Sequence, residues 1–456
     1  MHGRIRASSL GHGKNPKTAS CFGAARGEGV RVTRLLRLGL RQFGAGMLSI
    51  LALGILNRVM KVELGIDLGL VSLVIGLHYF AAPIAIPLGN RSDHRPLFGR
   101  HRTPYILAGA ALSALMTVAA PHVALWMGAT EASAVSVAAG AAVFLLLGVG
   151  IYAAGTAYLA LLADLTTEAE RGRSISIIWS MMMVGILAGV FLGVGLLEAY
   201  SAEALRRLFY VMAALLAGLT LLGVVGQEPA RTTPPAPEAV SNAQAWALLA
   251  RSRETRRFFA FLFAGILFLF LQQVVLEPFG GDVLGMNVRQ TTLFNAHQMT
   301  GVLVGMAVGG AWFSRRLGDR ATAAIGLALA SGSFALLAFS SLTVSAWATA
   351  PAIVVMGLGM GLFNVGGLAM MMGMSTPAHI GLYMGAWTLS QALANGVASI
   401  GGGWLHDAAL AVSGAESFAY GSVFVIESVG LIATVAMLAR VRPSAFRRER
   451  MQAIGA

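Results

Sequence analysis

Long apolar runs recur along almost the whole chain, and they constrain its fold more than any other feature. A membrane-spanning helix needs about 20 mostly apolar residues, and such runs extend from residue 40 to residue 439 of the 456. Hydrophobic residues make up 56% of the chain, against about 45–50% in soluble domains. The strict alternation of an outer-membrane barrel is absent. Because helices satisfy their own backbone hydrogen bonds in lipid, the sequence predicts an all-α polytopic membrane protein.

Twelve transmembrane helices are expected from these runs. They are predicted over residues 40–62, 68–88, 104–126, 135–162, 175–197, 208–225, 258–276, 291–313, 321–342, 346–372, 381–405 and 420–439. The stretch "QEPARTTPPAPEAVSN", at 227–242, is typical of a linker and separates six helices from six. The segment after it fits either an amphipathic helix on the membrane surface or a plain connector. The predicted parts are a disordered cytoplasmic tail (1–34), a six-helix half (35–226), a cytoplasmic linker (227–257), a second six-helix half (258–441) and a cytoplasmic tail (442–456).

The basic residues indicate how the helices are oriented in the membrane. With both termini cytoplasmic, 28 of the 33 Lys and Arg residues fall on the cytoplasmic side, which is the positive-inside pattern. The net charge of +13 therefore reflects loops on one side of a membrane and not a nucleic-acid surface. The single cysteine, Cys21, excludes an internal disulfide and a CxxC site.

Three predicted cytoplasmic loops resemble loops of the major facilitator superfamily. "GNRSDHRPLFGRHR" resembles the superfamily's G-x-x-x-D-R/K-x-G-R/K-R/K loop, "ADLTTEAERGRS" its D…RGR loop, and "SRRLGDR" repeats the basic turn in the second half. The resemblance implies that fold, with a six-plus-six pseudo-repeat around a midplane site, and cytoplasmic loops that latch the halves in one state. The residues that carry it in the first two loops are Gly89, Asp93, Arg95, Arg100, Arg102, Asp164, Arg171 and Arg173.

Charged groups are scarce inside the predicted helices, where Glu427 is the only carboxylate clearly within a span. A proton-driven exporter usually carries an acid there. Neutral polar groups and methionines are found instead, and they suit a large apolar ligand with few polar handles. His78, halfway along the second span, must find either a hydrogen bond to a neighbouring helix or axial ligation to a tetrapyrrole metal. The same alternatives hold for His297, nearer a span end. Further polar candidates are Gln272, Gln273, Asn364 and Gln391.

Longer stretches resemble a narrower family. "LNRVMKVELG", "RSDHRPLFGRHRTPYILAG", "QQVVLEPFGGDVLGMNVRQTT", "GLGMGLFNVGGLAMMMGMSTPAHIGLYMGAW" and "GGGWLHD" are similar to the PucC/LhaA group, the bacteriochlorophyll delivery family of the major facilitator superfamily. The resemblance implies a protein of the bacterial photosynthetic inner membrane that assists assembly of light-harvesting complexes. Its implied cargo is bacteriochlorophyll, and its implied partners are antenna polypeptides and the enzymes of pigment synthesis. "RSDHRPLFG" lacks the family's usual threonine after the aspartate, which leaves open the antenna served.

One polar pattern occurs twice, where the first helix of each half ends. "LNRVMKVELG" lines up with "LQQVVLEPFGG", so that Asn57 and Arg58 correspond roughly to Gln272 and Gln273, and Glu63 to Glu277. An arginine at the bilayer centre costs about 2.5–3.5 kcal/mol, so Arg58 should face the bundle and pair. The pattern fits either a structural ion pair or headgroup anchor, or a gate or ligand site built once per half. In the second case Glu63 and Glu277 are candidate partners of Arg58, Lys61 or a pigment's polar edge.

Catalytic motifs are not recognisable in the sequence. It has no Walker loop, no G-x-G-x-x-G between strand and helix and no H-E-x-x-H, so we predict a protein that is not an enzyme and has no metal site. Three functions remain: a light-harvesting complex assembly factor that binds or delivers bacteriochlorophyll, a proton-coupled secondary transporter of a small amphiphile, and a scaffold that binds antenna subunits without pigment.

Overall fold

The computed structural model describes residues 32–166, 168–228, 253–374 and 380–440. These residues form helices joined by short turns, with one isolated bridge between Leu97 and Arg100. Within the described ranges, nine helices are long and apolar enough to cross a membrane by length and composition.

The first half contains six helical runs, and two of them change helix type along their length. The first run passes from an α-helix into two π-helical stretches, and the second has a 3₁₀ stretch in its middle that contains Pro83. The elements are α1 (Val32–Ile50), η1 (Leu51–Leu56), η2 (Val59–Glu63), α2 (Leu68–Gly76), η3 (Leu77–Ile84), α3 (Ala85–His94), α4 (Thr103–Ala129), α5 (Ala134–Leu165), α6 (Glu168–Leu196) and α7 (Ala202–Val224).

The second half repeats this plan with six more runs. Its first run is broken by a 3₁₀ stretch, and its second ends in a π-helical turn followed by a short α-helix. The elements are α9 (Arg253–Phe270), η4 (Leu271–Val274), α10 (Leu276–Asp282), α11 (Val288–Val308), η5 (Gly309–Phe313), α12 (Ser314–Leu317), α13 (Asp319–Leu342), α14 (Thr349–Met374), α15 (Ile380–Ser413) and α16 (Glu416–Ala439). The described residues therefore contain the twelve predicted runs, six in each half.

Several helix ends differ from the predicted ones. The first helix begins at Val32 and not at residue 40, so the last residues of the predicted tail are helical. The seventh run begins at Arg253, inside the predicted linker. Most of that linker lies outside the described residues, as does the tail from residue 441. Of the segment predicted as amphipathic helix or connector, residues 243–252 lie outside them too, and residues 253–259 form the start of α9.

Arginine side chains explain the early start of the first helix. Arg37 donates to the carbonyl oxygens of Leu222 and Val225 at 2.8 Å, and Arg34 donates to the carbonyl of Gln227 at 2.6 Å. The last carbonyls of a helix have no partner within it, and cations are favoured at that end. The first turn of α1 therefore caps the C-terminus of α7.

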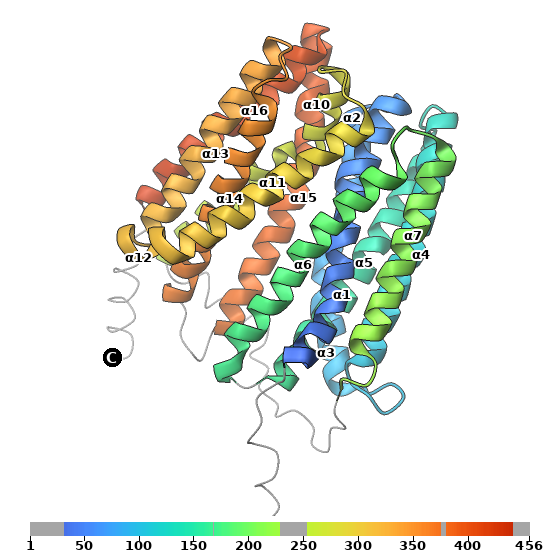
Figure 1. Cartoon of the computed structure of the whole chain (residues 1–456), viewed down its shortest axis with the longest axis vertical. Helices are drawn as coiled ribbons and strands as arrows, with labels where there is room; N and C mark the ends of the chain where they lie inside the picture. Colours follow the sequence, from blue (N-terminus) through green and yellow to red (C-terminus); the bar gives the residue numbers. More distant parts are fainter. Residues whose placement is uncertain (1–31, 167, 229–252, 375–379, 441–456) are drawn as a thin grey trace, which may run out of the picture.

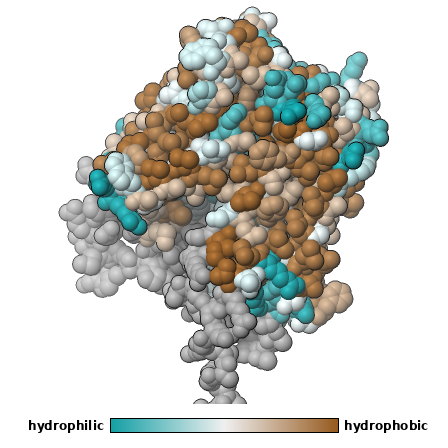
Figure 2. All heavy atoms as spheres, in the orientation of Figure 1, coloured by the Kyte–Doolittle hydropathy of each residue, from teal (hydrophilic) through white to brown (hydrophobic). Residues whose placement is uncertain are grey.

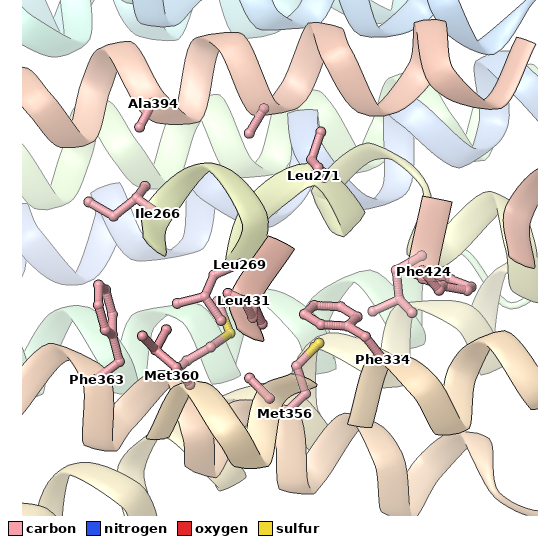
Figure 3. Close-up of a cluster of buried hydrophobic side chains, with 14 of the residues drawn as sticks. Ile266, Leu269, Leu271, Phe334, Met356, Met360, Phe363, Ala394, Phe424 and Leu431 are labelled. Atoms are coloured by element: carbon pink, nitrogen blue, oxygen red, sulfur yellow. The ribbon is translucent and has the colours of Figure 1, made fainter. Parts of the chain in front are cut away.

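The two halves lie side by side, the first in blue to green and the second in yellow to red (Figure 1). They meet where α2 packs against α15 and where α6 packs against α11. Each half has its own buried apolar core. Figure 3 shows part of the second, where Met356 points to Phe334 and Met360 points toward Leu269 and Leu431. Apolar side chains also cover much of the outer face in Figure 2, as a surface in contact with lipid requires.

Close glycine contacts repeat between the halves. In each half the fourth helical run packs against the second through a glycine whose added Cβ would overlap a backbone carbonyl oxygen. Gly148 of α5 lies against the carbonyl of His78, and Gly357 of α14 lies against that of Gln298. Small residues allow helices to approach this closely in lipid. The packing therefore relates His78 in the first half to Gln298 in the second.

Candidate functional site

Arg58 is buried near one end of the bundle, which we call the Glu63 end. It lies between the π-helical stretches η1 and η2, and π turns within helices are frequent at functional sites. Its Nη1 donates to Glu63 Oε1 at 2.6 Å, and its Nη2 donates to the carbonyl oxygen of Met286, in the other half, at 2.9 Å. The side chain of Arg58 is only 3% exposed. Arg58 therefore pairs with Glu63, as the sequence predicts, and also fastens the two halves together.

A second group of charges, the Lys61 network, joins the halves at the same end. Lys61 Nζ lies 3.2 Å from Glu416 Oε1, and the other Glu416 oxygen lies 2.9 Å from His406 Nε2. His406 Nδ1 lies 2.9 Å from Asp407, whose second oxygen accepts the backbone N–H of Gly69 at 2.6 Å. Both ring nitrogens of the buried His406 thus face carboxylates, which only accept hydrogen bonds. With both carboxylates ionised, each ring nitrogen of His406 would donate a hydrogen bond, and the network ties η2 and α2 to α15 and α16.

The helix break at η4 brings several polar groups together between the halves. Its Gln272 backbone N–H donates to Glu427 Oε1 at 2.5 Å. Asn57 donates to the carbonyl of Val274 at 2.6 Å, and the Tyr79 hydroxyl donates to the Gln273 side chain at 3.3 Å. Irregular backbone at membrane depth is tolerated where protein covers it, and broken helices line the sites of many transporters. Gln272 and Gln273 therefore lie at a helix break of the kind that lines transporter sites. Their predicted role in ligand binding remains a prediction.

Glu277 is buried just beyond the break but makes no ion pair with Arg58 or Lys61 among the described residues. Its Oε1 accepts a short hydrogen bond from Asn295, and it also lies against Gly54 of the first half. Its Oε2 has no hydrogen-bond partner in the described part of the chain. Glu277 lies in the α-helical α10, whereas Glu63 lies in the π-helical η2. The two windings turn by different amounts per residue, so residues that align in sequence face different directions.

His78 is buried in η3 with 8% of its surface exposed. Its Nδ1 lies 2.6 Å from the carbonyl oxygen of Ile75 in its own helical run, and its ring lies 3.9 Å from that of Tyr79. The described residues provide no hydrogen bond from His78 to a neighbouring helix, which was one of the two predicted roles. The other predicted role, ligation of a metal through Nε2, is compatible with this geometry.

The remaining interior candidates are not brought together with this group. Asn364 donates to the carbonyl of Met360 in its own helix at 3.1 Å. His297 is half-buried, and its Nδ1 has no partner among the described residues. Gln391 is half-buried on α15. Their predicted roles in ligand binding remain predictions.

The opposite end of the bundle, the Arg102 end, carries the predicted gating loops. Arg102 is 4% exposed; its Nε lies 3.1 Å from Asp164 Oδ2, and its Nη1 donates to Ser92 at 2.7 Å. These contacts fasten helices within the first half, whereas the sequence predicted a latch between halves. Arg95 and Arg100 are exposed on the turn. The surroundings of Gly89 and the side chains of Asp93, Arg171 and Arg173 lie outside what the structure describes.

Glu228 has a structural role that the linker prediction missed. Its carboxylate accepts the backbone N–H groups of His101, Arg102 and Thr103 at 2.6–2.9 Å. Burial alone would raise the pKa of Glu228, but these backbone donors lower it below its ordinary value. The beginning of the linker therefore caps the N-terminus of α4.

The Lys61 network was also missed from sequence. Its members in the second half, His406, Asp407 and Glu416, are local neighbours, and the first two end the stretch "GGGWLHD", which belongs to the family resemblance. An adjacent histidine and aspartate at the end of an apolar run was the available signal. In the described residues, no group of three or more His, Cys, Asp or Glu side chains is placed to hold a metal ion.

The comparisons with known proteins decide the family. The chain matches the PUCC protein family over residues 55–446. The chain belongs to the PucC family. It is 31% identical to Protein PucC of Rhodovulum sulfidophilum, covering 85% of this chain and 88% of the relative. It is 33% identical to an uncharacterized protein of the puhA-bchM intergenic region of Rhodobacter capsulatus, covering 92% of each. It is 32% identical to the bacteriochlorophyll synthase 44.5 kDa chain of Rhodobacter capsulatus, covering 89% and 94%.

Solved structures confirm the fold of this PucC family member. The nucleoside transporter NupG matches with a TM-score of 0.66 at 17% identity, over 90% of this chain and 99% of that one. A bacterial homologue of the iron transporter ferroportin, in an inward-facing state, matches with a TM-score of 0.66 at 13% identity, over 90% and 98%. At these identities the likeness shows the fold alone, which is the predicted major facilitator superfamily fold.

Proposed function

We propose that this protein is an assembly factor for light-harvesting complexes that binds bacteriochlorophyll and delivers it to antenna polypeptides. The observation that carries the proposal is the match over nearly the full length to PucC proteins and to a chain named for bacteriochlorophyll synthase. These names support a photosynthetic role, and delivery of the pigment is the proposed step beyond them.

The polar groups between the halves support binding of a large, mostly apolar ligand. Tyr79, Gln273 and Asn57 lie at the break in η4, where the two halves meet. They are neutral donors and acceptors, which suit the carbonyl groups at the edge of a chlorin macrocycle. We propose that the pigment binds here without chemical change, so the protein is not an enzyme.

We propose that the Glu63 end faces the periplasm and the Arg102 end the cytoplasm, in the photosynthetic inner membrane. The distribution of Lys and Arg supports this orientation. In the described arrangement Arg58 and the Lys61 network join the halves at the Glu63 end. Pigment would then reach the interior from the cytoplasmic side or from the lipid. The enzymes of pigment synthesis would be partners of this protein in that step.

Deletion of the gene in its photosynthetic host tests the proposal. The expected result is loss of an antenna complex while total bacteriochlorophyll synthesis continues, with restoration by the wild-type gene. Normal antenna absorption in the deletion strain would overturn the proposal. Crosslinking to antenna polypeptides in a pigment-free mutant, without pigment binding by the pure protein, would favour the scaffold function instead.

A proton-coupled secondary transporter of a small amphiphile is the second candidate. Glu277 and Glu427 favour it, because each is a buried carboxylate with one oxygen that lacks a partner among the described residues, and protonatable groups inside a membrane are typical of proton relays. This candidate predicts substrate flux in vesicles that an uncoupler collapses and that Glu277→Gln abolishes. Flux that persists with the uncoupler would exclude proton coupling.

A further inference from the structure

We propose that Nε2 of His78 is an axial ligand to the central magnesium of the tetrapyrrole cargo. The inference rests on the proposed function, because it names the contact that holds the pigment. It also goes further, because it predicts that the protein selects the magnesium-containing pigment over its metal-free counterpart.

The hydrogen bond at Nδ1 prepares the ring for this role. Nδ1 lies 2.6 Å from the carbonyl oxygen of Ile75, and a carbonyl oxygen only accepts, so Nδ1 carries the hydrogen. A neutral imidazole in this tautomer has its lone pair on Nε2. Histidines that bind metals almost always donate their other ring N–H to a carbonyl or carboxylate in this way. Nε2 itself has no hydrogen-bond partner among the described residues.

The second half offers a direct comparison for this position. Gln298 has the same packing, with its backbone carbonyl against Gly357 as that of His78 lies against Gly148. The Gln298 side chain is satisfied by the fourth helix of its half, because Nε2 lies 3.2 Å from Met360 Sδ. His78 makes no such contact with its own fourth helix. The repeat thus places a polar side chain bonded within its own half in one case, and in the other a ring nitrogen that has no hydrogen-bond partner in the described part of the chain.

The backbone around His78 is held tightly, which fixes the direction of the ring. α5 packs so closely at Gly148 that no side chain would fit between it and the His78 carbonyl. On another side, Gly396 of α15 lies against Tyr79 and Phe80. With 8% of its surface exposed, His78 can meet a macrocycle only after a packed neighbour moves, and α15 is the element of the other half that packs on η3. Pigment binding therefore selects an arrangement in which the halves are further apart.

Titration of the purified full-length protein in lipid nanodiscs tests the inference. The probes are bacteriochlorophyll and its magnesium-free bacteriopheophytin, followed by absorption and fluorescence quenching. The wild type should bind bacteriochlorophyll more tightly, and His78→Ala should weaken that binding at least about tenfold while leaving bacteriopheophytin binding unchanged. Added imidazole should restore bacteriochlorophyll binding to His78→Gly. His122→Ala is the matched control, because His122 is exposed on α4 and bonded to the Tyr210 hydroxyl at 2.6 Å, so this variant should bind like the wild type.

The outcomes separate this inference from the proposed function. Equal bacteriochlorophyll affinity of wild type and His78→Ala overturns the ligation and leaves pigment binding standing. A wild type that binds neither pigment overturns the proposed function itself. Labelling histidine with ¹⁵N gives a readout that needs no variant to fold. A pigment-bound wild type without a magnesium-bound imidazole signal overturns the inference.

Discussion

The buried ion pair of Arg58 and Glu63 should respond very differently to the loss of each partner. The Arg58 side chain is 3% exposed and that of Glu63 is 27% exposed. Glu63→Ala leaves a buried cation whose remaining bond is to the Met286 carbonyl. Arg58→Met leaves a carboxylate that water can reach, and it removes the buried charge altogether. The two substitutions break the same pair but leave unequal groups behind.

The magnitudes follow from these exposures. Removing one partner of a buried pair costs about 3–5 kcal/mol, and the partial access of water to Glu63 places Glu63→Ala near about 3 kcal/mol. Arg58→Met loses one carbonyl hydrogen bond, about 1 kcal/mol, and a pair that is partly exposed, about 0–1 kcal/mol. We therefore expect a loss of about 1–2 kcal/mol for Arg58→Met. The double substitution should resemble Arg58→Met alone, because it too removes the buried charge.

The free energy of unfolding of the purified protein, measured with a denaturant under one detergent condition, checks this order. Glu198→Ala is the matched control, since the Glu198 side chain is 72% exposed and lies 3.8 Å from Arg289, and it should change stability little. An Arg58→Met variant that is destabilised as much as Glu63→Ala would refute the reasoning. If Arg58→Leu leaves both folding and antenna assembly unchanged, the interpretation of this end as a functional gate or ligand site is wrong.

Three further predictions concern other parts of the bundle. Because the pKa of Glu228 is lowered from its ordinary 4.5, its stabilisation is present above that value and is lost as the pH falls through the lowered pKa. Glu228→Gln should therefore unfold more easily at about pH 7 and depend less on pH below about 4.5 in thermal unfolding. Arg102→Ala should cost about 2 kcal/mol in denaturant unfolding, because it loses the hydrogen bond to Ser92 and the pair with Asp164, whose side chain is 21% exposed. The exposed Arg100→Ala should have little effect, and equal losses would contradict this. Gly148→Ala should lower the apparent melting temperature through its overlap with a backbone carbonyl, whereas Gly218→Ala, with open space around it, should keep or raise it.

The helices and the pairing of residues within one helix could be predicted from the sequence, because both depend on residues that are near one another in the chain. Twelve apolar runs gave the twelve helices, because hydropathy over about 20 residues decides membrane insertion. The pairing of Arg58 with Glu63 was also predictable, since the two residues lie five apart on one helical run. The cost of an unpaired arginine in lipid is enough to require a partner nearby.

Contacts between distant residues were not predictable in the same way. Lys61 meets Glu416 across 355 residues, so the partner depends on how α16 packs against the first half. The break at η4 has no proline or glycine within it, and the Gln272 N–H is freed where Glu427 can accept it. Glu277 was one candidate partner of Arg58, but it accepts from Asn295 instead, because it lies in the α-helical α10 whereas Glu63 lies in the π-helical η2.

Pigment binding is best measured on the protein purified gently from pigment-producing cells. We expect bacteriochlorophyll to co-purify in near-equimolar amount, with near-infrared absorption that survives gel filtration. A major facilitator transporter from the same membranes, purified identically, should carry only background pigment. If the protein carries no more bacteriochlorophyll than that control, and takes up none when it is added, the proposed pigment delivery is wrong.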